Sequence, residues 1–161
     1  MLEAELSADS TEASGVRVPP PLFYVAGFLI GIGLEAAFPI DRPPVAITVA
    51  GSALGLGAWL ALDGAAMLSF RRARSSMIPM RPSTALVTSG AYRFTRNPMY
   101  LGMAFLYAAI ALVLGLVWPL IVLPVVIAAV DQLVIAIEEA HLVRRFGQPY
   151  CDYMRAARRW L

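Results

Sequence analysis

The sequence predicts an all-α fold: a polytopic membrane bundle of about four transmembrane helices, followed by a C-terminal helical segment at the membrane interface. Hydrophobic residues make up 59% of the 161-residue chain and charged residues 15%, whereas soluble proteins carry roughly 45–50% and 25%. Apolar runs also recur along the chain at close to the ~20 residues that a helix needs to cross a bilayer. These observations predict an integral membrane protein.

Short turns separate the expected spans. A proline-rich turn at residues 39–44 divides the first two. Trp118-Pro119 divides the last two and places Pro119 in the first turn of a helix. We therefore expect the last two spans to form an antiparallel hairpin, and Pro124 to kink the final span by displacing a backbone hydrogen bond. The spans are expected at residues 22–38, 45–70, 99–117 and 119–137.

Charge places the spans relative to the membrane. Residues 1–20 are acidic and lack an early basic cluster, which predicts a mobile cytoplasmic tail rather than a cleavable signal, with residues 21–161 as one membrane domain. The loop 71–97 and the tail after residue 138 are rich in arginine, whereas the turns on the other side hold only Arg42. The positive-inside rule then puts both termini and this loop in the cytoplasm. All the charged basic residues are arginine, with no lysine, which favours a GC-rich genome. We expect the membrane to be a bacterial inner membrane.

Two glycine pairs lie within the first two spans. They are Gly27-x-x-x-Gly31 and Gly51-x-x-x-Gly55. Such pairs allow close contact between two membrane helices, here the first two spans. The plainer interpretation is that glycine is common in membrane helices.

Two acids lie at membrane depth, where carboxylates usually face the bundle interior and pair. Asp131 lies two turns before Glu138 on one helix face, so it could extend a polar stripe inward. For Asp131 and Asp63 we favour an ion pair with Arg71, Arg96 or a similar residue. His141 and Cys151 are expected in surface or packing roles.

Two polar, aromatic-rich segments bracket the last hairpin on one side of the membrane. Residues 90–102 read Gly-Ala-Tyr-Arg-Phe-Thr-Arg-Asn-Pro-Met-Tyr-Leu-Gly, and the block from Glu138 reads Glu-Glu-x-x-Leu-x-x-x-Phe-Gly-x-x-Tyr-x-x-Tyr. Together they resemble the isoprenylcysteine carboxyl methyltransferase and phospholipid methyltransferase superfamily, over about 70 residues from Gly90 to Leu161. Asn97 stands where most members carry His, so an amide that cannot titrate replaces an imidazole.

The resemblance implies a methyltransferase that uses S-adenosylmethionine, releases S-adenosylhomocysteine and modifies an isoprenoid- or lipid-linked acceptor entering from the bilayer. The cofactor site would be built from residues 90–102 and 138–161 at the cytoplasmic face. Catalytic roles fall to Glu138 and Arg96. The residues implied to bind the cofactor are Gly90, Tyr92, Asn97, Pro98, Tyr100, Leu101, Gly102, Glu139, Leu142, Phe146, Tyr150 and Arg158.

These residue types suit the cofactor, which needs carboxylates for its ammonium, donors for its carboxylate and an aromatic slot for adenine. Catalysis of methyl transfer is mostly positioning and exclusion of water. Plainer interpretations remain for the individual residues. The glutamate pair could end a solvated helix or pair with Arg144 or Arg145, and Arg96 could anchor to lipid phosphates. Four tyrosines could stack on adenine or line the cleft, and each could equally be an interfacial anchor; they are Tyr92, Tyr100, Tyr150 and Tyr153. In the basic tail we expect Arg155 and Arg159 to face lipid while Arg158 closes over the cofactor.

Other classes find little support. No Gly-x-Gly-x-x-Gly motif follows a strand, which excludes a soluble Rossmann-type methyltransferase. No cluster of His and Cys suggests a metal site, and the net charge of +2 is too small to indicate nucleic acid. Two alternatives remain: a non-catalytic accessory membrane protein, favoured by Asn97, and a reductase related to sterol reductases, which would need room for a nicotinamide dinucleotide.

Overall fold

The computed structural model describes residues 18–73 and 86–161, where helices form every named element. The all-α class is confirmed. The expected tail before residue 18 and the loop residues Arg74 and Arg81 lie outside the described residues. The elements are helices α2 (Pro21–Ala37), α3 (Val45–Ala73), α4 (Pro98–Leu114), α5 (Trp118–Val130), α6 (Ala136–Phe146) and α7 (Gln148–Ala156), with a 3-10 turn η2 (Gly90–Arg93) and a π-helical segment η3 (Asp131–Ile135).

Two described helices are long and apolar enough to cross a membrane. One is Val45–Arg72 within α3, and the other is the continuous helix Trp118–Phe146 made of α5, η3 and α6. The helices α2 and α4 are apolar but have 17 residues each. At 1.5 Å per residue they cover roughly 25 Å, slightly less than a ~30 Å hydrocarbon core. That all four helices span the membrane therefore stays a prediction.

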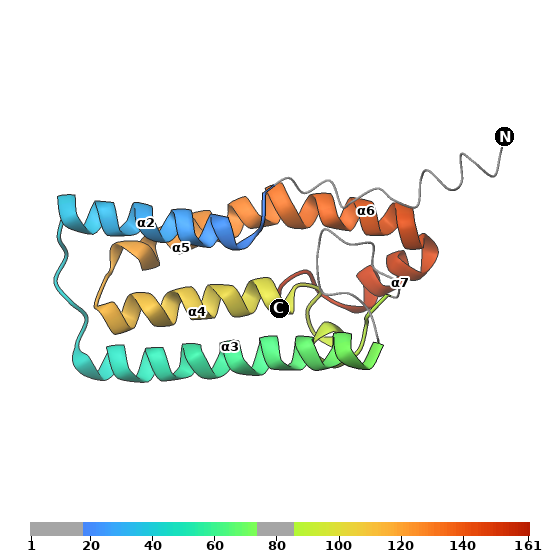
Figure 1. Ribbon diagram of the computed structural model, residues 1–161, viewed down its shortest axis with the longest axis horizontal. Helices are drawn as coiled ribbons and strands as arrows, with labels where there is room; N and C mark the ends of the chain where they lie inside the picture. The colour runs from blue at the N-terminus through green and yellow to red at the C-terminus, as the bar shows by residue number, and fades with distance from the viewer. Residues whose placement is uncertain (1–17, 74–85) are drawn as a thin grey trace.

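The helices run side by side along one long axis (Figure 1). α3 packs mainly on α4, and α2 packs mainly on α5. Figure 1 shows α4 between α3 and the α2–α5 pair. The predicted antiparallel hairpin of α4 and α5 is confirmed, and it turns at Gly115 with a φ of 66°, a left-handed conformation that suits glycine. η2, α6 and α7 lie at the end of the bundle opposite this turn, so the two polar segments meet there.

The glycine pairs permit close helix contacts, but not the contact expected. Gly27 and Gly31 face α5, and Gly51 and Gly55 face α4. A Cβ on Gly31 would lie 2.6 Å from the Cα of Pro119. The expectation that the two pairs join the first two spans to each other is therefore wrong. The reason is that α2 and α3 each pack on a helix of the second hairpin.

Glu35 fixes the opposite end of the bundle. Its Oε2 accepts hydrogen bonds from the backbone N–H groups of Val117 and Trp118, both at 2.9 Å. Its Oε1 accepts one from Ile40 at 3.2 Å. The first N–H groups of a helix have no partner within the helix. The carboxylate therefore accepts hydrogen bonds from free backbone N–H groups at the start of α5 and ties this helix to the end of α2.

The π-helical segment changes which side chains share a face of the last helix. The helix continues through Pro124, where a kink stays a prediction, and then widens at η3. A π turn holds one extra residue. Each later residue therefore points in the direction that the residue before it would have in a regular α-helix, a rotation of about 100° around the helix axis. Asp131 therefore shares its face with Glu139 rather than with Glu138, and Arg159 reaches both Asp131 and Glu139. The expectation that Asp131 and Glu138 align is wrong for this reason.

Gly31→Ala should destabilise the bundle, because the new methyl group meets backbone atoms of Pro119 that cannot move aside. We expect a loss of about 1–3 kcal/mol in the free energy of unfolding, measured as a lower melting temperature in detergent. Gly33→Ala is the matched control, since no atom lies within 4 Å of its Cβ position. It should leave stability unchanged or raise it by up to about 1 kcal/mol. Equal melting temperatures for the two variants would contradict the close approach of α2 and α5.

Candidate functional site

Arg96 is the most highly connected side chain at the end of the bundle where the two segments meet. Its Nε and Nη2 donate to Oε1 of Glu139 at 3.0 and 2.8 Å. Its Nη1 donates to the carbonyl oxygens of Met154 and Ala157 at 3.0 and 2.6 Å. The arginine is therefore a clamp between the start of α4, helix α6 and the end of α7. With a side chain only 10% exposed, it is not an anchor to lipid phosphates.

Arg159 supplies the second cation of this network. Its guanidinium donates to Oε2 of Glu139 and, at 3.1 Å, to Oδ2 of Asp131. Trp160 donates from its indole N–H to Oδ1 of Asp131 at 2.9 Å. The hydrogen bond to Glu139 raises the pKa of Arg159 above its usual range, so its charge is permanent. The expectation that Arg159 faces lipid is wrong, because it forms ion pairs with buried Glu139 and partly buried Asp131.

The segment before α4 holds the tail through its backbone as well. The N–H of Arg96 donates to the carbonyl of Arg158 at 2.8 Å. The side chains of Thr95 and Asn97 donate to the carbonyl of Arg159 at 3.1 and 2.9 Å. The amide of Asn97 thus orders the tail, a task that needs a donor and no titration. The side chain of Arg158 itself is exposed.

The two adjacent glutamates point to different partners. Glu139 is buried and faces the arginines, whereas Glu138 accepts hydrogen bonds from the phenol of Tyr100 at 2.9 Å on both oxygens. Successive helical residues lie about 100° apart, so α6 divides its carboxylates between the tail and α4. Pairing of either glutamate with Arg144 or Arg145 does not occur, and both arginines are exposed.

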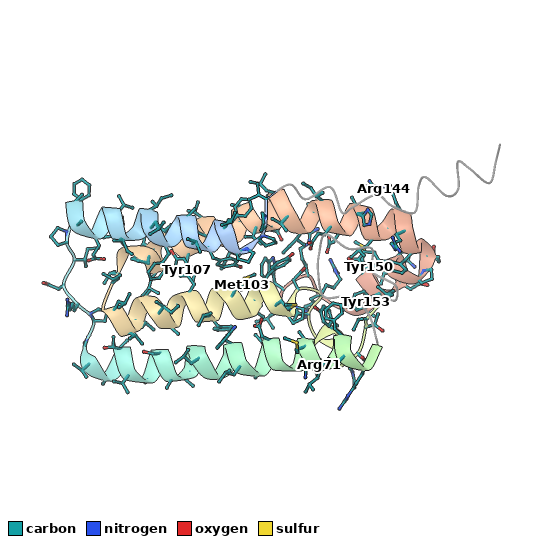
Figure 2. All side chains as sticks on the ribbon, in the orientation of Figure 1. Arg71, Met103, Tyr107, Arg144, Tyr150 and Tyr153 are labelled. Atoms are coloured by element: carbon teal, nitrogen blue, oxygen red, sulfur yellow. The ribbon has the colours of Figure 1, made fainter. Side chains whose placement is uncertain are left out.

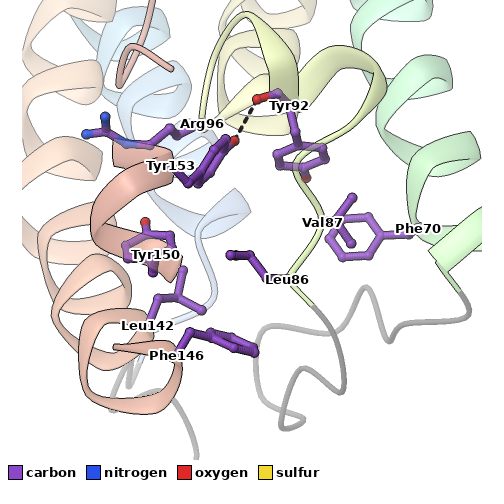
Figure 3. A pocket seen from close by; sticks show the side chains of 9 residues that line it. All are labelled: Phe70, Leu86, Val87, Tyr92, Arg96, Leu142, Phe146, Tyr150 and Tyr153. Atoms are coloured by element: carbon purple, nitrogen blue, oxygen red, sulfur yellow. Dashed lines mark hydrogen bonds between the residues drawn. The ribbon is translucent and has the colours of Figure 1, made fainter. Parts of the chain in front are cut away.

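A small cavity opens beside the clamp, between the end of α3, η2, α6 and α7 (Figure 3). Its volume is about 90 Å³. Aromatic rings and aliphatic side chains surround it, with the Arg96 side chain on one wall. It is therefore an apolar slot with a single cation at its edge. The lining residues are Phe70, Leu86, Val87, Tyr92, Arg96, Leu142, Phe146, Tyr150 and Tyr153.

Tyrosine contacts hold the cavity in shape. Tyr153 donates from its hydroxyl to the carbonyl of Tyr92 at 2.7 Å, which links α7 to η2 (Figure 3). The Tyr92 ring packs edge-on against Phe70 at 5.5 Å between centroids. Burial raises the pKa of Tyr153 to about 12 and raises the pKa of Tyr150 as well. The phenols therefore stay neutral donors near pH 7.

The cavity gathers five of the residues to which the sequence assigned catalytic or cofactor-binding roles, namely Tyr92, Arg96, Leu142, Phe146 and Tyr150. It does not gather the rest. Pro98 and Tyr100 are buried at the start of α4, and Leu101 and Gly102 follow on that helix. Gly90 begins η2 with a φ of 64°. The remaining four make the contacts described above and do not line the cavity; they are Asn97, Glu138, Glu139 and Arg158.

Sequence reasoning did not find three aliphatic or aromatic walls of the cavity, Phe70, Leu86 and Val87. They lie before the first segment and belong to no motif, so no signal in the sequence marks them. Tyr153 was weighed equally as a residue that lines the cleft and as an interfacial anchor, and it does line the cavity. The repeated Tyr-x-x-Tyr spacing at the end of the second segment is the signal that marks it, because it places Tyr150 and Tyr153 one helical turn apart.

Comparison with protein families decides the class of this chain. The pattern of the phospholipid methyltransferase family matches residues 45–149, which include α3, the first polar segment, the hairpin and most of the second segment. The chain belongs to the phospholipid methyltransferase family. Neither the curated proteins nor the solved structures compared with the chain include a match.

Membership of the phospholipid methyltransferase family, which is part of the integral membrane methyltransferase superfamily, points to a methyltransferase that acts on lipid-type substrates. With its long apolar helices, the chain is a membrane protein. The family match stops at residue 149. The tail that Arg96 and Asn97 hold therefore lies beyond the region that this phospholipid methyltransferase pattern describes.

Arg159→Ala should release the C-terminal tail, because it removes the ion pairs with Asp131 and Glu139. We expect faster digestion of the tail by a carboxypeptidase, a red-shifted emission from Trp160 and a loss of about 1–2 kcal/mol in stability. Arg158→Ala is the control, since its side chain is exposed and its backbone contacts are unaffected. Identical digestion of the two variants would contradict the role of the Arg159 ion pairs in holding the tail.

Proposed function

We propose that the protein transfers a methyl group from S-adenosylmethionine to a lipophilic acceptor at the cytoplasmic face of the membrane. The observation that carries the proposal is the aromatic cavity formed by both polar segments in a chain of a methyltransferase family. Adenine is flat and apolar on its faces, so a slot walled by tyrosine and phenylalanine rings suits it.

The cavity accounts for part of the cofactor rather than all of it. Small-molecule sites usually measure roughly 300–1,000 Å³, and this cavity measures about 90 Å³. Binding therefore requires lining side chains to move. Leu86, Leu142 and Phe146 are only partly buried, which makes them the side chains whose displacement costs least.

The charges beside the cavity suit the amino-acid end of the cofactor. Glu139 lies between two cations, Arg96 and Arg159. The amino-acid end of the cofactor carries one ammonium and one carboxylate. It can therefore replace one glutamate–arginine ion pair by two new pairs, from its ammonium to the glutamate and from its carboxylate to the arginine. We propose that its ammonium binds Glu139 and its carboxylate binds the arginine that it displaces, Arg159.

Orientation follows from the arginines at this end of the bundle. Arg71 and Arg72 end α3, and Arg144 and Arg145 end α6, all with exposed side chains. Figure 2 shows Arg71 and Arg144 at the end that holds Tyr150 and Tyr153. Positive loops stay in the cytoplasm, where the polar cofactor is available. The acceptor would enter from the bilayer between the helices and meet the methyl group beside Glu138 and Tyr100.

Transfer is an in-line displacement. An electron pair of the acceptor forms a bond to the methyl carbon while the carbon–sulfur bond breaks and its electron pair returns to sulfur. The positive charge of the sulfonium disperses in this step, so the chain contributes alignment and exclusion of water more than charge. The buried contacts around Tyr100 and Tyr150 supply a rigid, dry wall for this purpose.

A non-catalytic membrane protein that keeps the scaffold is the second candidate. Both oxygens of Glu139 are already taken by arginines, and the cavity is small. A protein that binds no cofactor is expected to have such a site, in which arginines occupy the glutamate and little free volume remains. This candidate predicts no affinity for S-adenosylmethionine.

Calorimetric titration of the detergent-solubilised protein with S-adenosylmethionine and S-adenosylhomocysteine separates the two candidates. We expect micromolar binding of both. Leu142→Trp should reduce the affinity at least about tenfold, because the larger ring fills the cavity that Leu142 lines. Ala140→Trp is the control, since Ala140 is exposed on the same helix and should bind as the natural sequence does.

Absence of binding in folded protein would sink the methyltransferase proposal and favour the accessory one. Binding that Leu142→Trp leaves intact, in protein with an unchanged melting temperature, would keep the activity but move the cofactor away from this cavity.

A further inference from the structure

The two acids at membrane depth have different surroundings. Asp131 forms an ion pair with Arg159 at 3.1 Å, as expected for an acid in this position. Within residues 18–73 and 86–161, Asp63 pairs with no arginine, contrary to expectation. Its carboxylate instead lies against Gly102 of α4, at the place that a Cβ on this glycine would take. Asp131 is therefore the membrane-depth acid that belongs to the charged network of the tail.

This network is a chain of four charged side chains that alternate in sign. Asp131 pairs with Arg159, Arg159 pairs with Glu139, and Glu139 pairs with Arg96. The two inner members thus have two partners each, and the two outer members have one. Opening the central link, between Arg159 and Glu139, leaves every member with a partner of opposite sign. Opening either outer link would leave one charge without such a partner, which is costly for a buried group.

Water reaches the central link from the side of the tail. The side chain of Arg159 is 35% exposed, whereas the side chains of Arg96 and Glu139 are 10% and 8% exposed. A polar ligand that arrives from water therefore meets Arg159 before it meets the shielded pair of Arg96 and Glu139. Accessibility and the count of remaining partners both favour exchange at the central link.

Asp131 holds Arg159 independently of Glu139. Its Oδ2 accepts a hydrogen bond from Nη1 of Arg159, while Glu139 accepts one from Nη2. Its Oδ1 accepts one from the indole N–H of Trp160 at 2.9 Å, and Trp160 packs against the core of the bundle. If a ligand takes over Glu139, Nη2 becomes free while Nη1 stays at Asp131. The guanidinium is then presented in a fixed direction, whereas a released arginine would regain its rotamer freedom in water.

The π-helical segment makes this arrangement possible. Asp131 is the first residue of η3, and the extra residue of the π turn places it on the face of Glu139, so that one guanidinium reaches both acids. Segments of this kind are rare and occur frequently at functional sites. A regular helix would cross the membrane equally well, so the shared guanidinium gives the irregularity a purpose.

We propose that Asp131 is a positioning residue that holds Arg159 for the carboxylate of the cofactor, and that the site thereby selects a ligand with a complete amino-acid end. The inference rests on the proposed function and assigns the residue that determines specificity within the same site. Asp131 touches neither cofactor nor acceptor and acts through Arg159. A ligand with an ammonium but no carboxylate would open the central link and leave Nη2 of Arg159 without an anion.

The test compares two ligands by calorimetric titration of the detergent-solubilised protein. S-adenosylhomocysteine carries the ammonium and the carboxylate, and its decarboxylated form keeps only the ammonium. We expect the unaltered protein to bind the complete ligand at least about tenfold more tightly. In Asp131→Asn the ratio of the two affinities should fall to about twofold or less, because asparagine keeps the shape of aspartate but not the charge that holds the guanidinium.

Two further variants separate positioning from structural support. Asp152→Asn is the control, because it removes an exposed acid that pairs with Arg155 on α7, and it should keep the ratio of the unaltered protein. Arg159→Ala should lower the ratio as far as Asp131→Asn does, and the two substitutions together should lower it no further, since one acts through the other. A general loosening of the tail would weaken both ligands by the same factor and leave the ratio unchanged.

Each outcome addresses a different claim. Failure of the unaltered protein to bind either ligand overturns the proposed function. Binding with a ratio that Asp131→Asn leaves unchanged overturns only this inference, and so does equal affinity of the unaltered protein for the two ligands. If Asp131→Asn does not fold, Arg159→Lys decides. Lysine keeps the charge but lacks the planar fork that spans Asp131 and a carboxylate, so an unchanged ratio in that variant would overturn the inference.

Discussion

The ion pair between Arg96 and Glu139 is the contact on which the arrangement of this site depends. It joins the segment that leads into α4 to helix α6, and the same guanidinium donates to two carbonyls at the end of α7. The pair is about nine-tenths buried on both sides. Removing one partner of such a pair leaves an uncompensated charge, at a cost of several kcal/mol. One cation thus fixes the segment before α4 to helices α6 and α7, which lie far along the sequence from it.

The π-helical segment gives this clamp its second half. By taking up one extra residue, η3 brings Asp131 onto the face of Glu139, so that Arg159 satisfies both carboxylates. Glu138 is left facing α4 and Tyr100. The helix therefore separates two kinds of acid: those that hold the tail, and one that looks toward the interior of the bundle. In the proposed enzyme this division corresponds to a cofactor side and an acceptor side.

The helical class, the turn residues and the two functional segments could be predicted from the sequence, because each rests on local chemistry. Apolar runs predict helices, Pro98 and Pro119 fit first turns, and Gly147 ends α6 with a φ of 59°. Partners were harder to predict. The two glycine pairs were expected to pack on each other, and Arg159 was expected to face lipid. A sequence pattern shows that a close helix contact or a charge is present, but not which helix or side chain is its partner.

The sequence by itself determined that the chain is helical and apolar, that its polar segments share one end of the bundle, and which residue types gather there. Those properties follow from hydrophobicity, proline and glycine geometry, and the direction of consecutive helices. Only the tertiary structure decided that Glu139 and Asp131 share the arginine of the tail, that α3 contributes Phe70 to the cavity, and that Asp63 lies over Gly102. These depend on helix phase and on contacts between distant segments, and one extra residue in a π turn is enough to change which side chains meet.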